Sequence, residues 1–253
     1  MYNVAIIGAG PAGIFSALEL VKKHPEWKIL ILEKGTRIEK RKCMIRNGAP
    51  SCPPCKKCGL LCGWGGAGAF SDGKLTLTPD VGGHLSEYMP RQKVEELIKY
   101  TDDIYLEFGA TDVVHGTNME DVAEIERAAT LAELKLVYSP VRHLGTERSL
   151  IVLKAMQDYL SEKTDIITDE AAKHLIIENG EIRGFTTDKG NTYYAENVIV
   201  APGREGADWL SHELANTDAE LVNNAVDVGV RVEIPAAVME HITDKLYESK
   251  LIY

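Results

Sequence analysis

The chain has 253 residues, of which 45% are hydrophobic, and a formal net charge of −10 from 28 basic and 38 acidic side chains. This composition is typical of a globular protein with one large or two small domains, and the acidity disfavours nucleic acid or an anionic membrane as the main partner. Residues 1–15 lack the basic region of a signal peptide, and no apolar run reaches the length of a membrane span. We therefore expect a cytoplasmic protein that acts on a small molecule.

The first 33 residues follow the order strand, glycine turn, helix, strand and acid. The apolar run 2–7 leads into Gly8-Ala9-Gly10-Pro11-Ala12-Gly13, a G-x-G-x-x-G motif. Apolar residues at three- and four-residue steps then predict a helix, and a second apolar run, 28–32, ends in Glu33. This order and length are typical of a dinucleotide-binding βαβ unit.

Each position of the motif has a physical role. Gly8 allows the tight turn, Gly10 lets a pyrophosphate approach the backbone, and Gly13 allows close packing of helix and strand. Free N–H groups at the start of the helix face the phosphates. Glu33 is placed to bind a ribose 2′-OH and to repel a 2′-phosphate. We predict that an adenine dinucleotide is bound by Gly8, Gly10, Pro11, Ala12, Gly13, Glu33 and Lys34.

All five cysteines lie between positions 43 and 62, within a stretch rich in Lys and Arg. Four of them, Cys52, Cys55, Cys58 and Cys62, have the spacing C-x2-C-x2-C-x3-C, and Cys43 precedes them. In a reducing compartment such a cluster favours a metal site. The spacing is that of ferredoxin [4Fe-4S] runs, although no proline follows Cys62. A structural zinc site, or a thiol pair without metal, remains an alternative.

A glycine-rich segment, 63–75, follows the last cysteine directly. It contains five glycines between positions 63 and 73, interspersed with Trp64 and Phe70. Flexible linkers lack such large apolar groups. We therefore predict a backbone cradle around a flat ring system.

The remaining elements are predicted from apolar periodicity, caps and turns. Helices are expected over 90–108 and 119–134, and a strand over 136–138. Thr146 is expected to cap a helix over 148–160. Strands are expected over 165–168, 172–178, 181–187, 192–194 and 197–200, with a hairpin turn at Asn179-Gly180. A helix over 218–228 and a strand over 229–234 follow.

These residues together resemble a family of bacterial and archaeal FAD-dependent dehydrogenases, labelled NAD(P)/FAD-dependent oxidoreductases. The resemblance covers essentially the whole chain. It is carried by GAGPAG with Glu33, the cysteine run, GWGGAGAFSDGKLTL, SPVRHLGT, VIVAPGREG and GVRVEIP. It implies an α/β fold: a Rossmann-like, three-layer FAD/NAD(P)-binding domain of the glutathione-reductase-like kind, with a parallel sheet and an antiparallel β-meander crossover.

The resemblance also implies domain limits and cofactor residues. Residues 1–215 would form the FAD-binding domain, with a cysteine-rich loop at 43–62 and a helical insertion at 84–135, and residues 216–253 would open a substrate domain. The ADP part would be held by the first glycine motif and Glu33. The ribityl chain and flavin would lie near Gly65, Gly66, Ala67, Ser71 and Asp72, and the pyrophosphate side near Ala201 and Gly203.

One departure concerns the cofactor. A late Gly-Asp motif of the family, which completes the FAD site, is missing from these residues. The chain is therefore expected to be a fragment that binds FAD weakly.

The expected function is that of an FAD-dependent oxidoreductase with NAD(P)H as a candidate electron donor. Lys74, Arg142 and His143 are candidates for polar groups near the flavin, where a cation stabilises reduced flavin and a histidine shuttles protons. An equal alternative is that Arg142 pairs with a carboxylate and that His143 is a structural residue with satisfied hydrogen bonds. A non-catalytic nucleotide-binding or redox-sensing module and a flavin-dependent RNA-modifying enzyme remain alternative functions.

Overall fold

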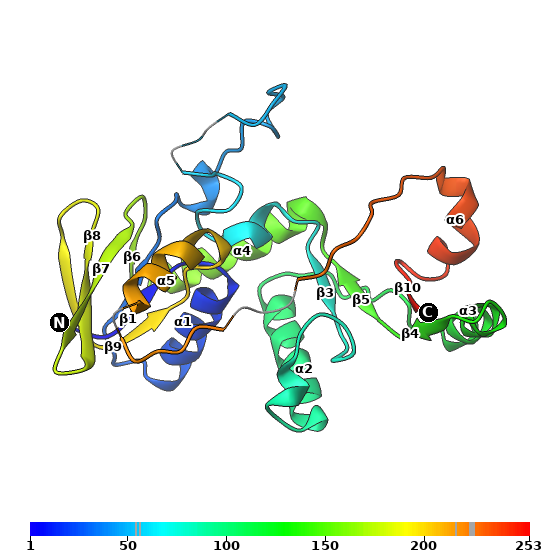
Figure 1. The fold of residues 1–253 in the computed structure, drawn as a ribbon, viewed down its shortest axis with the longest axis horizontal. Helices are drawn as coiled ribbons and strands as arrows, with labels where there is room; N and C mark the ends of the chain where they lie inside the picture. The colour runs from blue at the N-terminus through cyan, green and yellow to red at the C-terminus, as the bar shows by residue number, and fades with distance from the viewer. Residues whose placement is uncertain (54, 56, 216, 223–225) are drawn as a thin grey trace. The chain divides into compact units, whose positions relative to one another are not determined.

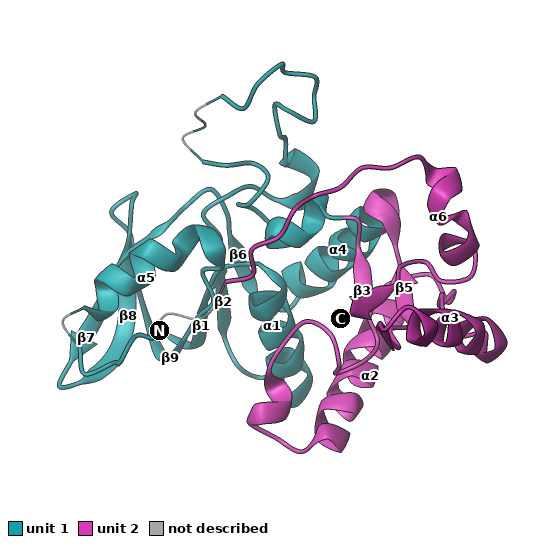
Figure 2. Ribbon diagram, turned by 45° about the vertical axis from the view of Figure 1, so that its right-hand side comes forward, with its two compact units in different colours: residues 1–71, 149–223 teal, residues 72–148, 224–253 magenta. Residues whose placement is uncertain are grey.

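The computed structural model describes residues 1–53, 55, 57–215, 217–222 and 226–253. The chain forms two compact units (Figure 2). Unit 1 consists of residues 1–71 and 149–223, and unit 2 of residues 72–148 and 224–253. This division differs from the domain limit expected at residue 215, because residues 72–148 group with the C-terminal segment.

Unit 1 is built on a mixed sheet (Figure 1). Its strand order is β6-β2-β1-β9-β8-β7. Strands β6, β2, β1 and β9 are parallel to one another, whereas β9, β8 and β7 form an antiparallel meander. The predicted α/β fold is thus confirmed. The strands are β1 (Tyr2–Ile7), β2 (Ile29–Leu32), β6 (Asp165–Ile167), β7 (Ala172–Glu178), β8 (Glu181–Thr187) and β9 (Thr192–Val200).

Strand β9 joins the two parts of this sheet. Its first residues pair with β8, up to Gly184↔Tyr194, and its later residues pair with β1, from Tyr2↔Ala195 to Ile7↔Val200. The two strands predicted over 192–194 and 197–200 are therefore one. The predicted hairpin turn between β7 and β8 is confirmed: Asn179 and Gly180 have φ of 53° and 79°, as a type I′ turn requires.

Helices and the meander cover the two faces of the parallel strands. Helix α1 (Pro11–Lys23) buries the predicted apolar stripe, which includes Ile14 and Leu18. On the other face, Ala5 and Leu30 pack in one cluster with Phe185 of the meander, and Trp209 packs against it. The other helices of unit 1 are η1 (Ile38–Lys40), η2 (Gly66–Phe70), η4 (Arg204–Gly206) and α5 (Ala207–Leu214).

Helix α4 (Gly145–Ser161) runs across the division between the units at residue 148. The predicted capping role of Thr146 is wrong, because the helix already begins at Gly145.

Unit 2 contains two small antiparallel pairs of strands. Strand β3 (Lys74–Thr76) pairs with β5 (Val141–His143), and β4 (Lys135–Val137) pairs with β10 (Lys250–Ile252). Val122, Leu136 and Leu246 share a small core, which ties the C-terminal segment to residues 72–148. The helices of unit 2 are η3 (Leu85–Glu87), α2 (Arg91–Glu107), α3 (Met119–Leu131) and α6 (Ala236–Thr243).

Two predicted elements near the C-terminus are wrong. Residues 218–222 and 226–228 are not helical, residues 223–225 lie outside the described part, and residues 229–234 form no strand. The apolar alternation there is real, but Val228 and Val230 are 94% and 90% exposed. Across the described ranges, no helix combines the length and apolarity needed to cross a bilayer.

Candidate functional site

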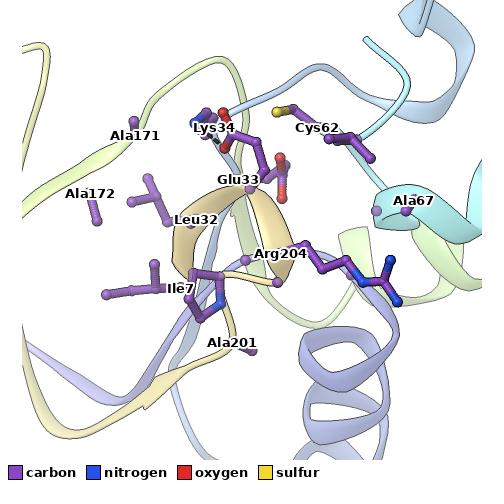
Figure 3. A pocket seen from close by; sticks show the side chains of 18 of the residues that line it. Ile7, Leu32, Glu33, Lys34, Cys62, Ala67, Ala171, Ala172, Ala201 and Arg204 are labelled. Atoms are coloured by element: carbon purple, nitrogen blue, oxygen red, sulfur yellow. Dashed lines mark hydrogen bonds and ion pairs between the residues drawn. The ribbon is translucent and has the colours of Figure 1, made fainter. Parts of the chain in front are cut away.

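A cavity of about 440 Å³ lies in unit 1 at the carboxyl ends of β1, β2 and β9 (Figure 3). Helix α1 leads from β1 to β2, while β9 flanks β1 on the opposite side. The strand order therefore reverses between β1 and β9, and open parallel sheets bind their ligands at such a switch point. The volume is in the range of small-molecule and cofactor sites.

The glycine turn forms the floor of this cavity, and its three glycines have different surroundings. Gly8 has a φ of 105°, and a Cβ there would lie 2.2 Å from the carbonyl oxygen of Ala201. A Cβ on Gly13 would lie 1.9 Å from the carbonyl oxygen of Gly8. At Gly10 the nearest atom to such a Cβ is 4.0 Å away. Gly8 and Gly13 therefore allow close packing, whereas Gly10 leaves backbone open to the cavity.

The start of α1 faces the cavity through Gly10 and Pro11. Among the described residues, no side chain caps this end, and its first turn carries no acidic residue. The first N–H groups of a helix have no intrahelical partner and bear the positive end of its dipole. This end is therefore suited to an anionic group.

Glu33, at the end of β2, is 7% exposed and binds backbone on three sides. Its Oε2 accepts a hydrogen bond from the N–H of Ala9, and its Oε1 accepts from Gly35 and Gly63, each at 2.8 Å. A carboxylate has about four acceptor positions, so about one remains for a ligand. Glu33 thus connects three turns around the cavity in addition to any contact with a ribose.

Arg41 binds the backbone of the glycine-rich segment and of the residues just before it. Its guanidinium donates to the carbonyl oxygens of Gly59, Leu60, Gly63, Trp64 and Gly66, at 2.6–3.4 Å. Burial lowers the pKa of Arg41, and the nearby charge of Glu33 opposes that shift. In the sequence, Arg41 is one of several basic residues in the cysteine-containing stretch. Its hydrogen bonds go to backbone oxygens, which leave no residue pattern in the sequence.

The glycine-rich segment, expected to be a cradle, reaches the glycine turn. The N–H of Gly65 donates to the carbonyl oxygen of Ala9 at 2.8 Å. A Cβ on Gly66 would lie 3.1 Å from the Cα of Gly10. The two glycine motifs therefore meet backbone to backbone at the cavity wall.

Most of the predicted cofactor residues line the cavity, and five do not. Ala12, Gly13 and Gly65 belong to unit 1 without lining the cavity. Ser71 is the last residue of the first segment of unit 1, and Asp72 is the first residue of unit 2. Those that line the cavity are Gly8, Gly10, Pro11, Glu33, Lys34, Gly66, Ala67, Ala201 and Gly203.

The cysteines do not converge. Cys52 and Cys55 are exposed, Cys43 and Cys58 are half-buried, and Cys62 is buried in the cavity wall. Burial, above all, raises the pKa of Cys62 to about 11, which keeps it a neutral thiol. In the part of the chain that the structure describes, no three His, Cys, Asp or Glu side chains are placed to hold a metal ion. The expected iron–sulfur or zinc centre thus has no support from this arrangement.

Charged residues of the cavity wall that sequence reasoning missed lie after β9 and before β7. Glu205 pairs with Lys34, and Arg204 precedes it in η4. Glu170 is 3% exposed and accepts a hydrogen bond from the amide of Asn191 at 2.9 Å. The signal available for Arg204 and Glu205 was their place directly after the Ala201–Gly203 turn.

The three catalytic candidates lie in unit 2, on the paired strands β3 and β5. Arg142 forms two hydrogen bonds to Asp102, at 2.6 and 2.7 Å, and both side chains are buried. The structural alternative for Arg142 therefore fits. Lys74 pairs with Glu248 at 3.0 Å, and this hydrogen bond raises the pKa of Lys74.

His143 contacts Asp72 at 2.9 Å through Nε2, and this hydrogen bond lowers the pKa of Asp72. Its ring also stacks on Tyr247, with centroids 4.5 Å apart. The cavity, in contrast, is lined by residues of unit 1.

Comparisons with known proteins match the chain only in part. No family model matches it. A curated protein of Clostridium beijerinckii, described as an uncharacterized protein, is 25% identical over 234 residues, which are 91% of this chain and 36% of that protein. The chain thus spans about a third of the length of this relative.

Several solved structures are similar at low sequence identity. A glycine oxidase from Bacillus cereus is 15% identical with a TM-score of 0.46, over 85% of this chain and 58% of its own. An L-proline dehydrogenase from P. horikoshii is 13% identical with a TM-score of 0.44, over 85% and 56%. An L-amino acid deaminase from Proteus vulgaris is 15% identical with a TM-score of 0.45, over 80% and 47%.

Proposed function

We propose that the cavity of unit 1 binds FAD and that the protein is an FAD-dependent oxidoreductase acting on a small molecule. The observation that carries the proposal is the arrangement of Gly10, the uncapped start of α1 and Glu33 around one cavity. A diphosphate needs open backbone and N–H groups, and a ribose needs an acceptor. All three are present at a switch point of the sheet.

The residues present fit the cofactor. The start of α1 would hold the diphosphate, the remaining acceptor position of Glu33 would take a ribose hydroxyl, and the backbone of Gly66 and Ala67 would lie along the chain that leads to the flavin. When bound, FAD supplies the two-electron chemistry, and the protein supplies binding and orientation. Glu33 would also disfavour a dinucleotide with a 2′-phosphate at this site. NAD(P)H is the electron donor that we propose.

The test is reconstitution of the purified chain with FAD, followed by flavin fluorescence and calorimetry. Gly10→Leu projects a side chain into the cavity and should abolish binding without unfolding the protein. Gly229→Ala is the matched control, since a Cβ there meets no atom within 4 Å. Equal FAD affinity of Gly10→Leu and the unaltered chain would contradict the proposed site.

Turnover is tested separately by anaerobic addition of NADH or NADPH to the reconstituted protein. Loss of the flavin absorbance at visible wavelengths supports the oxidoreductase. Two results together would instead favour the non-catalytic nucleotide-binding module. FAD would bind tightly but neither NADH nor NADPH would reduce it, and flavin reduced with dithionite would pass its electrons to no acceptor tested.

A further inference from the structure

Most charged side chains of the cavity wall have a hydrogen-bond or ion-pair partner, but one does not. Lys34 pairs with Glu205, and Glu33 is held by backbone N–H groups. Glu170 is held by Asn191. Arg204 also lines the cavity. Its backbone carbonyl accepts a hydrogen bond from the N–H of Ala207, but no hydrogen bond or ion pair joins its guanidinium to another described residue. Arg204 is thus a cation on the wall whose guanidinium donors have no partner among the described residues.

The position of Arg204 is set by the turn after β9. The N–H of Ala201 donates to the carbonyl oxygen of Ile7 at 2.8 Å, which fixes this turn beside the end of β1. The contact of Ala201 with Gly8 then brings it against the glycine turn. Gly203 has φ and ψ of 65° and −169°, a backbone conformation that residues with a side chain rarely adopt, directly before Arg204.

Figure 3 shows the Arg204 side chain extended away from Lys34 and toward the start of the helix that follows the glycine turn. Gly10 and Pro11, at that start, line the same cavity as Arg204. The cavity therefore presents a guanidinium on one wall and the start of α1 on the other, where the helix has N–H groups without an intrahelical partner and the positive end of its dipole. A guanidinium fork matches the geometry of phosphate oxygens better than an ammonium does.

We propose that Arg204 binds the diphosphate together with the start of α1 and gives this cavity a preference for nucleoside diphosphates and dinucleotides over the bare nucleoside. The proposal rests on the proposed function, because it assigns a contact within the same site. Arg204 binds the diphosphate from the side opposite to α1, and Glu33 holds the ribose. Lys34 does not share this role, because its ammonium is already paired with Glu205.

The experiment measures the binding of FAD, ADP and adenosine to the full chain by calorimetry, with NMR titration for the weaker ligand. The variants are Arg204→Met and Arg204→Lys, with Arg183→Met as the control. Arg183 lies on β8, pairs with Glu181 and does not line the cavity. Hydrogen bonds to charged groups predict that Arg204→Met weakens ADP and FAD roughly 10- to 100-fold. Adenosine affinity should stay within about twofold, since the nucleoside has no phosphate.

Two further readouts separate a phosphate contact from a structural role. The affinity of the unaltered chain for ADP should fall with ionic strength more steeply than that of Arg204→Met. Arg204→Lys should recover part of the ADP affinity, because it keeps the charge and loses the fork.

An unchanged ADP affinity in Arg204→Met, or an equal loss for adenosine and ADP, would overturn the inference alone. If the unaltered chain binds neither FAD nor ADP, the proposed function fails and the inference fails with it.

Discussion

Replacing Glu33 by glutamine tests whether this carboxylate holds the cavity together without any ligand. The glutamine oxygen can keep the hydrogen bonds from Gly35 and Gly63, but its NH2 group then faces the N–H of Ala9. One hydrogen bond to a buried charged group is lost, at a cost of about 2 kcal/mol. Glu33→Ala removes the acceptor of all three N–H groups, and its cost is about 5 kcal/mol. That loss approaches the whole stability of a small domain.

The assay is urea unfolding followed by tryptophan fluorescence. All three tryptophans of the chain, Trp27, Trp64 and Trp209, belong to unit 1, so this signal reports on the unit that contains the cavity. A loss of about 2 kcal/mol should lower the urea midpoint of Glu33→Gln by about 1 M.

Glu26→Gln is the control for that assay, because Glu26 has a side chain that is 68% exposed and precedes β2 in the same unit. A midpoint of Glu33→Gln equal to that of the control would refute the reasoning. It would mean that water accepts the hydrogen bond from the N–H of Ala9 without a loss of free energy of unfolding.

Three further predictions concern packing, a buried ion pair and a thiol. Gly13→Ala should destabilise unit 1 by about 3 kcal/mol or more, measured by the same urea assay, because its Cβ would lie 1.9 Å from a backbone oxygen. Asp102→Ala should cost about 3–5 kcal/mol, seen by circular dichroism, since it leaves Arg142 buried without its partner, and Arg142→Met in the same chain should restore part of the loss. Cys62 should be the slowest cysteine to react with iodoacetamide at pH 8, where only about one thiol in a thousand is ionised, and mass spectrometry should show its rate rising as the pH approaches 11. Rapid alkylation of Cys62 in the folded protein at pH 8 would contradict its burial.

The local elements of unit 1 were predictable because their signals are local. The strands 172–178 and 181–187 were predicted with the bounds that the structure has, since alternation and an Asn-Gly turn define both ends. The run 2–7, the glycine turn and the helix after it were predicted for the same reason. These signals need no knowledge of distant contacts.

Elements that depend on a partner were not predictable in this way. Strand β9 continues through Ala195 and Glu196, where the apolar pattern is interrupted. It does so because β8 pairs with the first half of β9 and β1 pairs with its second half. The alternation over 229–234 is typical of a strand, yet the described residues provide no strand to pair with it. Pairing is a property of two segments, so a pattern in one segment predicts only a tendency.

The same distinction applies to the site. Glycines were identified because a missing side chain is itself the signal for close approach, and the structure shows that approach at Gly8 and Gly13. Arg41 was not identified, because its partners are carbonyl oxygens that every residue carries. Its guanidinium binds carbonyl oxygens of the segment 59–66, while Glu33 accepts a hydrogen bond from the N–H of Gly63 in the same segment. The backbone conformation of the glycine-rich segment therefore depends on the buried charges of Arg41 and Glu33 and not on its glycines alone. We expect that the same glycines without Arg41 would not hold this conformation at the cavity wall.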